Sequence, residues 1–241
     1  MLYLEIALAS LIAGALDTVA GFGGGLLLLP VLVLVAGSKD AVLLAALIPL
    51  GWNLPRVIML RQWIDWKITG LFTLGIVPGT ALGALLLDSV DPDLLRRGIG
   101  VLLLLFGIYY VLRLYFDLPG PRGAKRWVFP ILGLVSGIIG GLLGAGHGPF
   151  QAGGLMSADV PVREATAING ALGGITALAR IGSYGAAGLM HEGIWVPAIA
   201  GIIGAVAGAM LGIRLSRRAK DSTLELIVGV AIALAGFRML L

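Results

Sequence analysis

Two glycine clusters are the part of this sequence best suited to hold a ligand. They are Gly21-Phe22-Gly23-Gly24-Gly25 and Gly144-Ala145-Gly146-His147-Gly148, and each interrupts an apolar stretch. Glycine leaves backbone N–H groups accessible, and successive N–H groups near helix ends form an anion-binding nest. A nucleotide-binding loop is disfavoured, because neither cluster is followed by Lys-Ser or Lys-Thr. We therefore predict that all the glycines of both clusters, with Phe22 and His147, surround a small anion.

Three polar residues on or near these clusters extend the predicted site. His147 can titrate near neutral pH, so it could bind the anion or couple proton movement to transport, unless it is only a neutral hydrogen-bonding residue. Gln151, one helical turn later, is a candidate ligand for an oxyanion. Asp17, four residues before the first cluster, would repel an anion unless it is protonated or paired. It is either the acceptor of a coupling cation or a cap or partner for a nearby arginine.

Two arginines lie within long apolar segments. A charged side chain near the bilayer centre costs at least about 2.5 kcal/mol unless it is paired or hydrated. We predict that Arg56 and Arg180 attract the anion at the two mouths of a pathway or close them, with Arg180 also a substrate ligand. The alternative is snorkelling to lipid headgroups. Asn53, one turn before Arg56, is predicted to line the same path.

A polar face on one apolar helix provides further candidates. Its spacing of three, four and seven residues is helical, so these side chains should look into the bundle. Asn169 is a predicted substrate ligand, whereas Thr166 and Thr176 either line a path or form interhelical hydrogen bonds. The face comprises Thr166, Asn169, Gly173, Thr176, Arg180 and Tyr184.

The composition places these residues in a membrane protein. Of 241 residues, 59% are hydrophobic and 12% are charged, whereas a soluble domain has about 45 to 50% and about 25%. The formal charge of +4 is interpreted as loop charge set by membrane topology and not as a nucleic-acid surface. Without cysteine there is no thiolate metal site, and His191 with Glu192 is too few residues for a metal. We predict no cofactor, no metal and no enzymatic activity.

Apolar stretches define the helices that must position the site. Six stretches are long enough to span a bilayer, which takes about 20 helical residues. The remaining four form two pairs, each split by a glycine cluster. The regular series Gly75, Gly79, Gly83 and Gly204, Gly208, Gly212 are predicted to be packing seams. The stretches are 2–20, 24–36, 41–60, 68–87, 94–116, 127–143, 149–157, 162–188, 193–213 and 223–241.

The two halves of the chain resemble copies of each other. One offset aligns Gly14, Gly21, Gly23 and Gly25 with Gly137, Gly144, Gly146 and Gly148, and a slightly larger offset aligns Arg56 with Arg180. The predicted division is a first transmembrane repeat at 1–116, a basic linker at 117–126 and a second repeat at 127–241.

The charge distribution favours inverted repeats. If each split pair is a re-entrant hairpin, most Lys and Arg residues fall on one side, with Lys39, Arg96 and Arg97 opposite; membrane-crossing pairs give no such bias. By the positive-inside rule the basic loops are cytoplasmic. The predicted fold is an all-α polytopic membrane protein with two inverted repeats, each a glycine-broken helix pair, re-entrant or discontinuous, plus three transmembrane helices. The predicted cytoplasmic loops are 61–67, 113–126, 158–163 and 214–221.

The first cluster followed by Leu26 to Leu29 and Pro30, repeated in altered form before Pro149, resembles the sulfite exporter TauE/SafE family. The length, the duplication and the central basic linker also fit. Two positions depart from the paired pattern, because His147 replaces a glycine and Gly153 stands where the first copy has Pro30. The resemblance implies a multi-pass carrier of the bacterial inner membrane that moves sulfite, organosulfonates or related small anions, driven by an ion gradient.

We therefore predict a secondary transporter that binds a small anion within the lipid bilayer and works by alternating access. An anion channel with the same binding loops is the first alternative, and a non-transporting membrane scaffold is the second. The sequence leaves open which anion is carried, the coupling ion (proton or sodium), the direction of transport and the oligomeric state.

Overall fold

The computed structural model describes residues 2–20, 23–116, 123, 125–158, 160–215 and 221–240, and within these ranges the chain is helical, with no strand. Gly21 and Phe22, residues 117–122 and 124 of the linker, and residues 216–220 of the last basic loop lie outside the described residues. The elements are α1 (Leu2–Ala20), α2 (Gly24–Ala36), α3 (Ser38–Leu47), α4 (Leu50–Leu60), η1 (Arg61–Trp63), α5 (Trp66–Ser89), α6 (Pro92–Phe116), α7 (Val128–Leu143), α8 (His147–Ser157), α9 (Val162–Ala186), η2 (Glu192–Ile194), α10 (Trp195–Leu215) and α11 (Asp221–Leu240).

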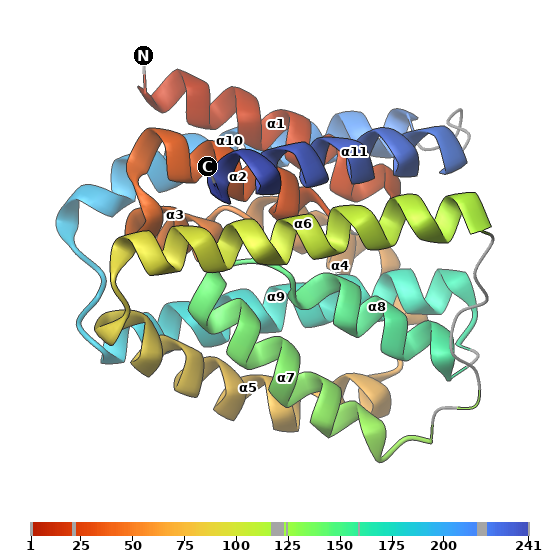
Figure 1. Ribbon diagram of the computed structural model, residues 1–241. Coiled ribbons are helices and arrows are strands. Elements are labelled where there is room, and N and C mark those ends of the chain that lie inside the picture. Colours follow the sequence, from red (N-terminus) through yellow and green to blue (C-terminus); the bar gives the residue numbers. More distant parts are fainter. Residues whose placement is uncertain are drawn as a thin grey trace.

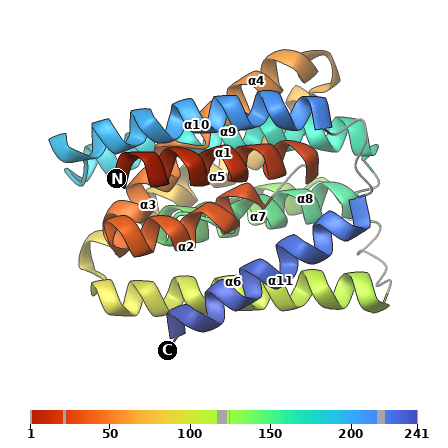
Figure 2. The same ribbon diagram turned by 90° about the horizontal axis from the view of Figure 1, so that it is seen from above.

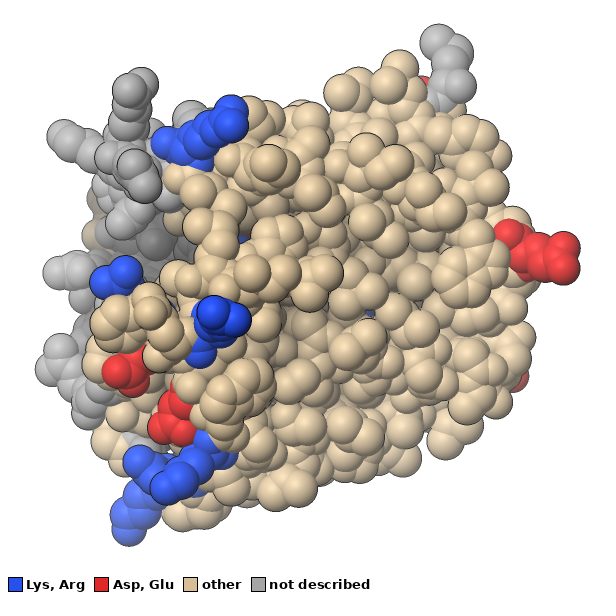
Figure 3. Space-filling model, turned by 180° about the vertical axis from the view of Figure 1, so that it is seen from behind, with Lys and Arg blue, Asp and Glu red and all other residues tan. Residues whose placement is uncertain are grey.

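The outside of the bundle is apolar and its interior holds polar side chains. Leu74, Leu85 and Leu105 are exposed, whereas Gln151 and Arg180 are fully buried. Among the described residues, four helical segments are long and apolar enough to cross a membrane: Leu2–Val19, Ser38–Trp63, Trp66–Ser89 and Glu192–Arg214. The arrangement is that of a multi-pass membrane protein and confirms the predicted all-helical class. Figure 3 shows one such surface, with charged side chains at its ends and a broad uncharged area between them.

The regular glycines form packing seams, as predicted. A Cβ added at Gly75, Gly79 or Gly83 of α5 would overlap backbone carbonyls of α7, so only glycine permits this approach. Gly204 and Gly208 of α10 stand in the same relation to the carbonyls of α1. Small residues drive such close helix packing where lipid supplies no hydrophobic force.

The two halves are interlocked through these seams. Helix α1 of the first half packs against α10 of the second, and α7 of the second half packs against α5 of the first. Helices α6 and α11 pair with each other (Figure 2). Each contact therefore has a counterpart when the halves are exchanged.

Two helical hairpins, α1 with α2 and α7 with α8, bring the glycine clusters inside the bundle. The outer ends of α1 and α2 lie at the end of the molecule where α5 joins α6 (Figure 1). The outer ends of α7 and α8 lie at the opposite end, where α6 finishes (Figure 1). The hairpins thus enter from opposite ends, and their glycine turns meet in the interior.

Candidate functional site

The helices break at glycines that adopt a left-handed backbone conformation. Gly23 precedes α2 with φ of 98°, and Gly146 precedes α8 with φ of 89°. Gly144 ends α7 with φ of 78°. Residues with a Cβ rarely adopt these angles, which explains the choice of glycine. The N-cap residues of α2 and α8, Gly23 and Gly146, have no side chain, so the first N–H groups of both helices depend on acceptors from elsewhere.

Both glycine turns line one central cavity, which contains about 480 Å³ of space not filled by protein atoms, part of it open to solvent. Helices α1, α2, α3, α4, α8 and α9 contribute to its wall. Most of the predicted site residues meet here. The predicted residues in its lining are Asp17, Gly23, Gly25, Asn53, Arg56, Gly144, Gly146, His147, Gly148, Gln151, Asn169 and Gly173. The others are Leu26, Ala45, Pro49, Trp52, Ala145 and Pro149.

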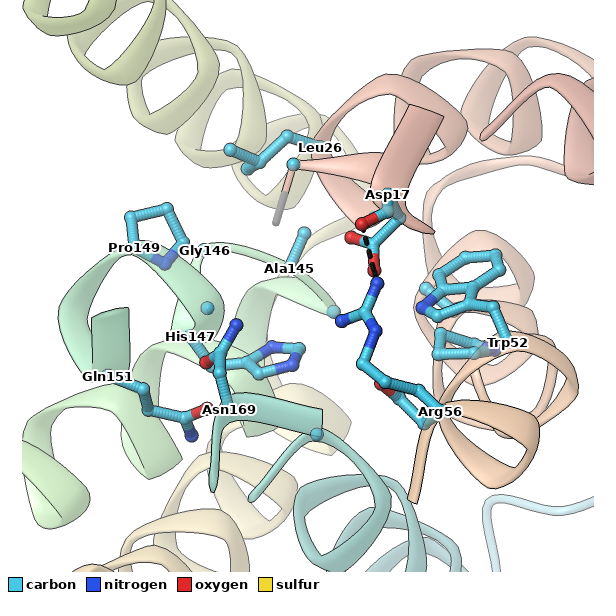
Figure 4. Close-up of a pocket in the computed structure, with 18 residues that line it drawn as sticks. Asp17, Leu26, Trp52, Arg56, Ala145, Gly146, His147, Pro149, Gln151 and Asn169 are labelled. Atoms are coloured by element: carbon cyan, nitrogen blue, oxygen red, sulfur yellow. Dashed lines mark hydrogen bonds and ion pairs between the residues drawn. The ribbon is translucent and has the colours of Figure 1, made fainter. Parts of the chain in front are cut away.

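One wall of the cavity carries a buried ion pair (Figure 4). Arg56 Nη2 lies 2.6 Å from Asp17 Oδ2 and donates to the Asp17 backbone carbonyl at 2.5 Å. The second carboxylate oxygen, Oδ1, accepts from the Gly24 N–H at 3.0 Å. Asp17 is therefore both the cap and the arginine partner that the sequence offered as one alternative. Gly24 serves the site through this bond and is not itself part of the cavity lining.

Amide and imidazole side chains form the opposite wall. His147 and Gln151 come from α8 and Asn169 from α9, and they lie close together in Figure 4. Gln151 is fully buried and donates from Nε2 to Thr176 Oγ1 at 3.2 Å. Thr176 therefore stands behind Gln151 and outside the cavity lining. It holds the side chain that faces the ligand space.

Arg180 and Tyr184 lie behind the second glycine turn. Arg180 donates to the backbone carbonyls of Gly140 and Gly144, and at 2.5 Å to that of Ala45 in α3. Tyr184 donates to the Gly141 carbonyl at 2.6 Å. The carbonyls of Gly140, Gly141 and Gly144 lie at the C-terminal end of α7, whose partial negative charge a cation stabilises. Both terminal guanidinium nitrogens of Arg180, a predicted substrate ligand, are turned to backbone carbonyls, and Arg180 is not among the residues that line the central cavity.

A second, outer cavity begins on the far side of the ion pair. It contains about 560 Å³ of space not filled by protein atoms, part of it open to solvent. Trp52 and Arg56 line both cavities, so they stand between them. Thr166, predicted as a pathway residue, lines the outer cavity with Thr18, Pro55, Met59, Leu60, Ala209 and Ile213. Helix α4 continues from Leu60 into the basic turn at Arg61.

The family model described as "Sulfite exporter TauE/SafE" matches residues 6–239. The chain belongs to the TauE/SafE family. Among its relatives, the probable membrane transporter protein MJ0441 of Methanocaldococcus jannaschii is 26% identical over 249 positions, covering 95% of this chain and 92% of the relative. The probable membrane transporter protein YunE of Bacillus subtilis is 20% identical over 270 positions, covering 100% and 98%. No solved structure matches the chain.

Membership of the TauE/SafE family confirms the sequence resemblance. The chain is a membrane transporter and not an enzyme, in agreement with the prediction. Trp52 is the main cavity residue that the sequence reasoning missed. Its signal was its position one helical turn before Arg56, which places both side chains on one face of α4.

Proposed function

We propose that this TauE/SafE protein is a secondary transporter that moves a small anion, sulfite or an organosulfonate, across the bacterial inner membrane by alternating access. The central cavity carries this proposal. The N-termini of α2 and α8 start at its glycine turns, where α2 is capped at Gly24 by Asp17 and α8 has no side-chain cap, and Arg56 lies in its wall. Helix N-termini and guanidinium groups both attract oxyanions.

The glycines and amides supply the proposed ligands. Backbone N–H groups at Gly25 and Gly148 can approach an anion closely, since a Cβ at either position would meet open space. Asn53 and Asn169 add amide groups from α4 and α9. Gly21 and Phe22 keep their predicted place in the first loop, outside the described residues.

The proposed gate is the Asp17–Arg56 pair with Trp52. Trp52 and Arg56 line both the central and the outer cavity, and Asp17 lines the central one, which supports this assignment. An anion arriving in the central cavity competes with the Asp17 carboxylate for Arg56. Asp17 displaced in this way takes up a proton, because an unpaired buried carboxylate is costly. Asp17, with His147 as the second titratable group in the wall, is thus the proposed link to a coupling proton; sodium is the alternative coupling ion.

We also propose that the halves are inverted repeats, which is a common basis of alternating access. The exchange of contacts between α1, α10, α5 and α7 and the entry of the two hairpins from opposite ends support this arrangement. The basic loops would then be cytoplasmic. In Figure 3 many of the visible Lys and Arg side chains lie at one end of the molecule.

Within this scheme Arg180, Thr176 and Tyr184 support the site from behind. Arg180 and Tyr184 fix the carbonyl end of α7, so that the turn can present its N–H groups to the cavity. Thr176 fixes Gln151. Rocking of the interlocked helices would expose the loaded cavity to either side in turn.

Ligand-dependent stabilisation of the purified chain tests the anion site, because a ligand that binds only the folded state raises its stability by RT ln(1 + [L]/Kd). Sulfite, sulfoacetate, thiosulfate, sulfate, acetate and chloride would be compared on wild type, His147→Ala and Ser157→Ala. Ser157 is a matched control on α8, since its hydroxyl donates to Gly154 of its own helix. Stabilisation by a sulfur oxyanion that weakens only in His147→Ala supports the proposal. Stabilisation by sodium alone, without any anion effect, would refute it.

Counterflow in proteoliposomes separates the carrier from a channel. A carrier exchanges labelled for unlabelled anion across the membrane and saturates, whereas a channel gives large unitary currents. The Asp17–Arg56 ion pair, whose arginine lines both cavities, favours the carrier. Unitary currents carried by sulfite would overturn alternating access.

A further inference from the structure

The Gln151 amide has one orientation that its neighbours allow. Thr176 Oγ1 donates its single proton to the Leu172 carbonyl at 2.7 Å. The hydroxyl oxygen can then only accept from Gln151, so the amide atom 3.2 Å away is the donor Nε2. An amide turned the other way would set two acceptor oxygens against each other. Gln151 therefore has its carbonyl oxygen, Oε1, directed away from Thr176.

This oxygen lacks a donor in the protein. Gln151 is fully buried, and among the described residues none donates a hydrogen bond to Oε1. His147 Nδ1, one helical turn earlier on α8, is also buried without a partner among the described residues, and it donates or accepts according to the tautomer. Buried acceptors left without a partner are rare and unfavourable. Since Gln151 lines the central cavity, a bound molecule can supply the missing donor.

We infer that the cavity selects oxyanions that carry an O–H or N–H donor of their own. The class includes the protonated form of an oxyanion, such as hydrogensulfite, and hydroxy- or amino-substituted sulfonates. The charged oxygens would face Arg56 and the loop N–H groups, and the donor would face Gln151 Oε1. An oxyanion without a donor would instead place lone pairs against Oε1. This inference rests on the proposed anion site and adds its specificity.

Matched sulfonates test the inference, because sulfonates stay fully ionised and the members of a pair differ in one hydroxyl. Dissociation constants would be measured by calorimetry on the purified full chain. The pairs are ethanesulfonate with 2-hydroxyethanesulfonate, and propanesulfonate with 3-hydroxypropanesulfonate. We expect the hydroxylated member of at least one pair to bind about tenfold more tightly, the effect of leaving one buried acceptor unpaired. Equal binding within both pairs would overturn the inference and keep the anion site, whereas no binding of any sulfonate or of sulfite would overturn both.

Variants assign the preference to the Gln151–Thr176 arrangement. Gln151→Met keeps a similar shape without the acceptor, so the affinity ratio should fall to about one. Thr176→Val removes the group that fixes the amide and should lower the ratio, whereas Thr176→Ser keeps the hydroxyl and should preserve it. Ser157→Ala should leave the ratio unchanged.

Three results would contradict this assignment. The first is an undiminished preference in Gln151→Met. The second is an equal loss of preference in Thr176→Ser and Thr176→Val. The third is stabilisation by sodium without anion that disappears in Gln151→Met, which would assign Oε1 to a cation.

Discussion

The two glycine turns share one backbone design but differ in the side chains that complete it. The offset that aligns Gly23 with Gly146 also aligns Asp17 with Gly140 and Gly24 with His147. Each half has an arginine that donates to the carbonyl at the matched position: Arg56 to Asp17 and Arg180 to Gly140. The polar side chain of the first turn, Asp17, thus lies on the helix before the break (α1). That of the second turn, His147, lies on the helix after the break (α8).

This difference indicates that the two turns have different roles in transport. Arg56 is held in part by a carboxylate that can be protonated. Arg180 is held by backbone carbonyls, which cannot change charge. The first turn is therefore suited to a change of partner during transport, and the second to a fixed shape. Four predictions, from the largest expected effect to the smallest, test this contrast.

Arg180→Ala should cause the largest loss of stability, at least about 3 kcal/mol in the free energy of unfolding, because it leaves several buried carbonyls without a charged donor. The measurement is the shift in apparent unfolding temperature of the purified protein. Arg180→Lys, which keeps the charge but not the forked geometry, should lie between this variant and wild type. An Arg180→Ala variant that stays stable and loses only anion affinity would instead indicate that Arg180 is an anion ligand.

Arg56→Gln should mainly affect transport. Removing a buried charge that is proposed to contact the anion should cost about 2 kcal/mol or more, so sulfite counterflow should fall roughly 30-fold or more. The fold should survive, since Asp17 can take up a proton and still accept from Gly24. Proteoliposomes with reconstituted protein provide the measurement. Counterflow at the wild-type rate in this variant would show that Arg56 takes no part in transport.

The matched positions Gly24 and His147 should respond differently to alanine. A Cβ at Gly24 would lie 2.5 Å from both the Ala13 carbonyl oxygen and Asp17 Cβ, so Gly24→Ala should destabilise the fold by about 1 to 3 kcal/mol. His147→Ala should keep the fold and reduce anion affinity about tenfold by loss of one ligand. Parallel measurements of unfolding and of anion binding check both. Equal destabilisation by the two substitutions would contradict the proposed contrast.

Asp17→Asn should have the smallest effect on exchange itself. Asparagine keeps one acceptor oxygen, which can serve Gly24, while Arg56 keeps the Asp17 backbone carbonyl, so counterflow should change less than about tenfold. Uptake driven by a pH gradient should disappear, because the titratable partner is gone. Transport assays with and without the gradient make the comparison. Gradient-driven uptake that persists in Asp17→Asn would move the coupling to His147 or to another ion.

Much of this arrangement was predictable from local signals. The breaks occur at the glycine clusters because only glycine adopts the required backbone angles cheaply. The seams followed from the spacing of Gly75, Gly79 and Gly83. The convergence of Asp17, His147 and Gln151 followed from their closeness to the clusters in sequence, whereas Arg56 was expected at a mouth of the pathway and lies in the wall of the central cavity.

The position of Arg180 could not be predicted in the same way. Helical spacing places it on the face that also carries Asn169, yet the two residues differ in what they contact. Whether a buried guanidinium binds an anion or backbone carbonyls depends on where α7 ends in space. The sequence around Arg180 does not predict that position. Trp52 was missed for a related reason, since an aromatic residue in an apolar helix most often belongs to the core.

The interlocked seams also determine when the protein can finish folding during synthesis. Helix α1 packs against α10 through the glycines of α10, and α10 emerges from the ribosome only near the end of translation. Contacts between residues so distant in sequence form slowly, because a long loop must close first. Until α10 is inserted, the carbonyl ridge of α1 that the α10 glycines cover faces lipid. The first half is therefore not an independent folding unit, and a chain interrupted before α10 would remain incomplete at α1, its first helix.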